Sequence, residues 1–107
     1  MAVLALTDLL PGTTQTTSVI SIPKTALNLT SENVDADKFV AAVAIKVKEL
    51  MTQAQFDAEY EQNVYASDGF DGFSTKNNGT EDISFLVRQI VINLGKPDEA
   101  TLNPEDY

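Results

Sequence analysis

The chain has 107 residues, a formal net charge of −9, and no cysteine, histidine or tryptophan. These absences exclude a thiolate nucleophile, an imidazole base, and zinc or iron–sulfur sites built from sulfur and nitrogen ligands. The acidic balance argues against binding to nucleic acid or to an anionic membrane, because both require clustered lysine and arginine. A chain of this length fits one small domain.

Residues 1–18 are predicted to be an N-terminal arm. Pro11–Gly12 separates an apolar tip from a polar, threonine-rich run, and the leucines of the tip are Leu4, Leu6, Leu9 and Leu10. We expect the tip to lie apart from the domain's own core and to be buried on a neighbouring subunit, with a frayed terminus as the alternative. The first residues lack a basic group and a long apolar run, so we expect neither a signal peptide nor a membrane span.

Residues 19–95 are predicted to form a single domain that begins with extended chain. In the segment 19–30, apolar residues alternate with polar ones on both sides of Pro23, which is a strand pattern with a bend at the proline.

The segment 31–51 is predicted to be a long helix, because apolar residues recur at steps of three and four and either Ser31 or Asp35 can cap its start. Residues 43–47 also fit strand alternation, but the nearby alanines and the length of the pattern favour a helix. We expect its apolar stripe to be buried against a sheet that contains residues 83–94; the stripe consists of Val40, Val43, Val47 and Leu50. A second, short helix is predicted from Thr52, where Thr-Gln-Ala-Gln matches a capping box, and we expect it to fade by Asn63.

The C-terminal half of the domain carries the signals of a β-hairpin. Val64–Tyr65 is predicted to be a short strand, and residues 67–82 a polar loop that repeats Asp-Gly-Phe and ends in an Asn78–Gly79 turn. Residues 83–94 are the clearest strand; their alternation changes parity at Arg88–Gln89, which predicts a bulge or burial on both faces.

These elements together predict an α+β fold, in which a small, mostly antiparallel sheet is packed by one long helix and a short second helix. After the domain, residues 96–107 are acidic and twice interrupted by proline. We expect them to form an extended tail.

Few residues are candidates for chemistry. The one group of acids worth testing as cation ligands or catalytic carboxylates lies around the glycine loop and consists of Asp68, Asp71, Glu81 and Asp82. Their spacing fails the EF-hand pattern, because aligning Gly79 places Ser74, Lys76 and Phe85 at ligand positions. Aspartate and glycine are also the residues that turns prefer. We therefore expect no metal, no cofactor and no catalytic residue. Phe70 and Phe73 are candidate interface anchors, with packing on the chain's own core as the alternative.

The apolar arm over residues 4–18, the early strand at 18–23 and the tail at 93–107 resemble the small structural proteins of tailed bacteriophage particles. This resemblance implies many copies in symmetric packing, a major capsid protein and further copies of the chain as partners, and no catalysis. The expected function is that of a non-enzymatic virion protein assembled in the host cytoplasm, foremost a capsid decoration (cement) protein. The expected interface residues are Leu4, Leu6, Leu9, Leu10, Phe70 and Phe73.

Three alternatives stay open. The first is a phage neck or tail assembly protein. The second is an acidic adaptor or inhibitor of a basic protein, although its acids are spread along the chain rather than gathered in a stripe. The third is a calcium-binding module or carboxylate-based hydrolase centred on residues 68–82. Either function requires carboxylates that are brought together in a defined site, and an acidic composition alone does not establish one.

Overall fold

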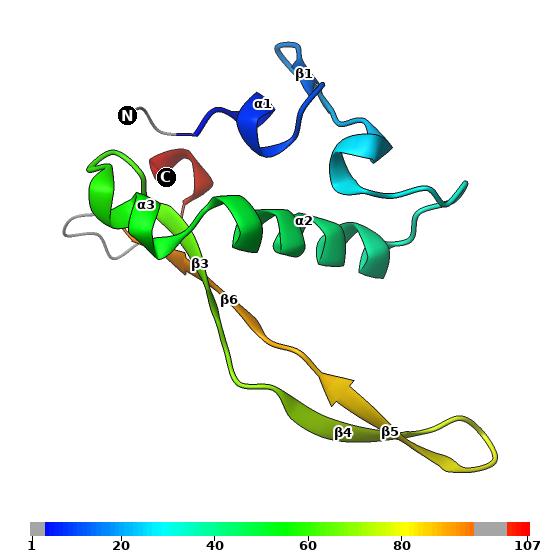
Figure 1. Ribbon diagram of the computed structural model, residues 1–107. Helices are drawn as coiled ribbons and strands as arrows, with labels where there is room; N and C mark the ends of the chain where they lie inside the picture. Colours follow the sequence, from blue (N-terminus) through cyan, green and yellow to red (C-terminus); the bar gives the residue numbers. More distant parts are fainter. Residues whose placement is uncertain (1–3, 96–102) are drawn as a thin grey trace.

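A computed structural model describes residues 4–95 and 103–107 (Figure 1). The elements in chain order are α1 (Leu6–Leu9), β1 (Thr14–Gln15), β2 (Ile20–Ser21), the 3-10 helix η1 (Lys24–Leu27), α2 (Ala36–Leu50), α3 (Gln53–Ala58), β3 (Val64–Asp68), β4 (Gly72–Asn77), β5 (Asp82–Val87), β6 (Ile90–Leu94) and the 3-10 helix η2 (Pro104–Asp106). The strands pair as three antiparallel two-stranded sheets, β1–β2, β3–β6 and β4–β5. The predicted α+β class is confirmed.

The two predicted helices form, and side-chain caps set their starts. The Asp35 carboxylate accepts the backbone N–H of Lys38 at 2.9 Å, so α2 begins at Ala36 rather than near residue 31. The Thr52 hydroxyl accepts the N–H of Gln55 at 3.2 Å and caps α3, as its sequence predicts. The short connection between the helices is fixed to β3, since the N–H of Ala66 donates to the Met51 carbonyl at 2.8 Å.

Strands β3 to β6 form one long, bent ribbon. The break between β5 and β6 falls at Arg88–Gln89, where the sequence predicts it, and Asn78–Gly79 lies in the turn between β4 and β5 with Gly79 at a φ of 106°. The prediction of a loop over residues 67–82 is wrong for Gly72–Asn77. This polar segment lacks apolar alternation, but it pairs residue by residue with β5.

The N-terminal arm packs on α2, and the expectation that it lies apart from the core is wrong. Leu10 is only 3% exposed and forms the core cluster with Ala26, Leu27 and Ala42. The chain turns back after Leu10 because Gly12 adopts a φ of 86° and the Thr13 hydroxyl donates to the Leu10 carbonyl at 2.7 Å. Leu6 and Leu9 pack against the same cluster.

Two further predicted segments differ. Extended chain over 19–30 is wrong for Lys24–Leu27, which form η1; Asn28 closes this turn in the left-handed region at a φ of 56°. Residues 96–102 of the predicted tail lie outside the described residues, and Pro104–Asp106 form a 3-10 turn rather than extended chain.

The predicted packing of α2 against the sheet holds only at Val47, while Val43 packs against the core cluster that contains Leu10. Val47 is 7% exposed, whereas Val40 is 64% exposed and Leu50 is 38% exposed. The reason is visible in Figure 1: β3 lies against the end of α2, but the ribbon then runs away from the helix toward the β4–β5 tip. The radius of gyration is 16.9 Å, compared with about 13 Å for a compact chain of this length.

Candidate interaction surface

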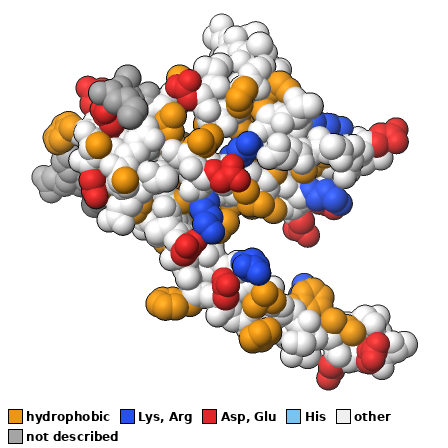
Figure 2. Space-filling model, in the orientation of Figure 1, with side chains coloured by type: hydrophobic (Ala, Val, Ile, Leu, Met, Phe, Trp, Pro, Cys, Tyr) orange, Lys and Arg blue, Asp and Glu red, His pale blue; other side chains and the backbone are white. Residues whose placement is uncertain are grey.

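The projecting ribbon, defined as residues 69–90, carries apolar side chains on both faces. Cross-strand partners lie on the same face, so Phe73 shares one face with Leu86, while Phe85 shares the other with Ile83 and Val87. All five are exposed; the largest exposed fraction is 81%, at Phe73. Figure 2 shows hydrophobic side chains (orange) along the ribbon where it leaves the rest of the molecule. Neither face is therefore covered by the chain itself.

A hydrogen-bonded bend holds the base of the ribbon. The Gln89 side-chain oxygen accepts the N–H of Phe70 at 2.8 Å, and the Gln89 carbonyl accepts the N–H of Gly69 at 3.0 Å. A side chain at position 69 would overlap the Gln89 side chain, so Gln89 would have to move and give up its hydrogen bond to Phe70. The bend leaves the Phe70 ring 91% exposed.

The predicted interface residues divide into two groups. Phe70 and Phe73 both lie on the exposed ribbon, with neither ring folded onto the core. Leu10 is buried within the chain and is not available to a partner. Leu4, Leu6 and Leu9 are half-buried, and their contact with a partner stays a prediction.

The loop acids do not converge. Asp68 pairs with Lys48 of α2 at 2.8 Å, and Asp71 lies 3.8 Å from Arg88 at the ribbon base. Asp82 accepts the Asn77 amide at 2.9 Å beside the far turn, where Glu81 also lies. Among residues 4–95 and 103–107, no three acidic side chains are grouped as they would be to hold a metal ion.

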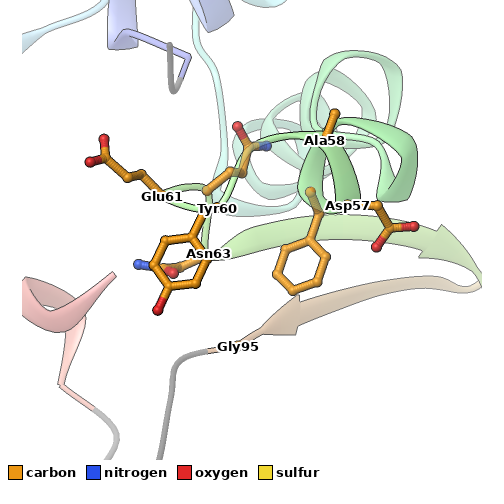
Figure 3. A pocket seen from close by; sticks show the side chains of 8 residues that line it. Asp57, Ala58, Tyr60, Glu61, Asn63 and Gly95 are labelled. Atoms are coloured by element: carbon orange, nitrogen blue, oxygen red, sulfur yellow. The ribbon is translucent and has the colours of Figure 1, made fainter. Parts of the chain in front are cut away.

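A hollow of about 960 Å³ lies between α3 and the end of β6 (Figure 3). Its two carboxylates, Asp57 and Glu61, point to opposite sides, and the Tyr60 ring is 89% exposed. Gln62 is 1% exposed beside this hollow; its amide nitrogen donates to the Val64 carbonyl at 3.2 Å, and its side-chain oxygen has no hydrogen-bond partner. Acids arranged in this way do not form a facing catalytic pair.

Sequence reasoning missed the exposed apolar residues of β5. The segment 83–94 has the pattern of a core strand, but Ile83, Phe85, Leu86 and Val87 all remain accessible to solvent. The signal that could have found them was the apolar alternation on both parities, which requires cover on both faces. A two-stranded ribbon cannot provide that cover.

Comparison with protein-family models, with curated protein sequences and with solved structures found no match. Among the described residues, no helix has both the length and the apolar character needed to cross a bilayer.

Proposed function

We propose that the chain is a non-enzymatic structural subunit that works in a multi-copy assembly, and specifically a decoration protein of a tailed bacteriophage capsid. The observation that carries this proposal is that the chain buries few hydrophobic side chains in its own core and leaves larger ones exposed on the ribbon. Among residues 4–95 and 103–107, six hydrophobic residues are buried, all of them aliphatic, while the aromatic and aliphatic side chains of β4 and β5 are exposed. Large contiguous apolar surfaces on a soluble chain are typical of interaction sites.

Two further features support the proposal. The molecule measures 52 Å along its longest axis and 25 Å along its shortest, so a single copy reaches far beyond its own core. Arms of this kind let one subunit contact several neighbours in a closed lattice. In addition, the acids are dispersed along the fold, and several of them are held in ion pairs or turns. This arrangement favours a structural role for the carboxylates over a catalytic or metal-binding one.

The projecting ribbon also favours a second candidate, a subunit of the phage neck or tail. A ring or tube needs a heterologous contact between one surface and a different surface of the next copy, and a protruding ribbon can supply one.

Copy number tests both candidates. Particles are purified from the native source on a density gradient, and the chain is quantified by mass spectrometry against the major shell protein. A decoration protein is present in a fixed, high ratio to the shell protein, and its removal lowers the temperature at which the particle releases its DNA. A neck or tail subunit is present in few copies and leaves that temperature unchanged. Absence from purified particles contradicts the proposal.

A further inference from the structure

The uncovered half of α2 and the uncovered ribbon are two apolar surfaces of the same chain. Val40 lies seven residues before Val47, so the two side chains project from the same side of the helix. Val47 is buried and Val40 is exposed, because β3 covers only the C-terminal part of α2 and the ribbon bends away at Gly69 and Gln89. On this side of the helix, β3 therefore covers Val47 and leaves Val40 without cover.

We propose that the uncovered face of α2 around Val40 is the docking site for the β4–β5 ribbon of a second copy of this chain, which places its Phe73–Leu86 face on the helix. This inference rests on the proposed function and names one partner of the subunit in its assembly.

The dimensions of the two surfaces allow the contact. Strands of six residues span about 20 Å, whereas the uncovered half of the fifteen-residue helix α2 spans about 11 Å, so the ribbon is long enough to cover it. At their exposed fractions of 81% and 50%, Phe73 and Leu86 present on the order of 250 Å² of apolar surface. A standard interface buries about 450 Å² of apolar surface per partner. The Phe73–Leu86 face therefore supplies roughly half of that area, which fits a weak and reversible contact.

The charges also favour a second copy. The chain carries a net charge of −9, so two copies repel unless the acids lie away from their contact. The ribbon has three acids against Lys76 and Arg88, a net charge of −1, and α2 has three lysines against Asp37 and Glu49, a net charge of +1. Both surfaces are thus nearly neutral and opposite in sign, and most of the negative charge lies elsewhere.

Association is tested on the purified chain by sedimentation velocity across a concentration series. We expect reversible self-association of the parent, weakened at least about tenfold by Val40→Asp and by Phe73→Ser. Two matched variants are controls: Val19→Asp repeats the first substitution at a valine that is 52% exposed on the arm, and Phe85→Ser removes an aromatic ring from the opposite ribbon face. Circular dichroism of every variant checks that the fold is retained.

Cross-linking identifies the surfaces, because the chain has no cysteine of its own. A chain carrying Val40→Cys is mixed with a chain carrying Thr75→Cys, because Thr75 lies on the Phe73 face of the ribbon. In the control mixture, a chain carrying Thr17→Cys replaces the chain carrying Val40→Cys. We expect a mixed disulfide with Val40→Cys and little with Thr17→Cys. A chain that stays monomeric, or a mixture in which Val40→Cys forms no more mixed disulfide than Thr17→Cys does, overturns the self-docking proposal. The copy number in particles decides the proposed function independently of either result.

Discussion

Leu10 tests whether the N-terminal arm belongs to the chain's own core. The side chain is 3% exposed and contacts a cluster whose other members are Ala26, Leu27 and Ala42. Truncating a buried leucine to alanine costs about 3 kcal/mol, from lost burial together with the cavity left behind. A domain with so small a core has a total stability near the low end of about 5–15 kcal/mol. Leu10→Ala should therefore remove a large share of the free energy of unfolding.

The assay is thermal unfolding followed by circular dichroism, at a concentration at which the chain is monomeric. Leu10→Ala is expected to lower the melting temperature by about 10 °C or more. Phe73→Ala is the control: it removes a larger side chain that is 81% exposed, and should change stability by less than about 0.5 kcal/mol. Deletion of residues 1–12 should unfold the domain. If Leu10→Ala matches the parent and the deletion keeps its fold, the arm does not contribute to the core and the packing described above is incorrect.

Three further predictions follow from the same structure. Val47→Asp should unfold the domain by placing an unpaired charge in the core, while Val40→Asp on the same helix should leave the monomer's melting curve nearly unchanged; equal effects of the two would refute the packing of α2. Hydrogen bonds from Lys38, first from its backbone N–H and then from its side chain, lower the pKa of Asp35. The stabilisation by this carboxylate is therefore complete above its unfolded pKa of about 3.9 and is lost as the pH falls through the lower folded value. Asp35→Ala should flatten the acid limb of a stability–pH profile, and an unchanged limb would contradict the role of Asp35 as the cap of α2. Millimolar calcium should leave the melting temperature unchanged, because the loop acids lie apart; a rise of several degrees would show that they bind the ion.

Local signals in the sequence were sufficient to predict much of the framework. Asp35 and Thr52 act through hydrogen bonds to N–H groups three residues away, and Asn78–Gly79 needs only its own backbone freedom. The break at Arg88–Gln89 was similarly readable from the change of parity. Each of these features depends on residues close together in the chain, so a sequence pattern can identify it.

Features that depend on distant pairing were not predictable in this way. The residues of β4 are mostly polar and form a strand only because β5 lies in register beside them. Likewise, the arm returns to α2 through the left-handed turn at Gly12. The spacing of apolar residues in the arm does not indicate the direction in which the chain turns there. The sequence identifies Phe70 and Phe73 as candidate anchors because aromatic rings on a glycine loop are unusual. It predicts that the apolar residues of β5 are buried, but in a single copy no other element covers them.

The most direct test of the central claim is a cryo-electron microscopy reconstruction of the native particle. We expect a repeating density for this chain on the particle, with the β4–β5 ribbon of each copy lying along α2 of its neighbour. A particle without such density, together with a purified chain that forms a one-to-one complex with a basic protein, would contradict the claim and favour an acidic adaptor instead.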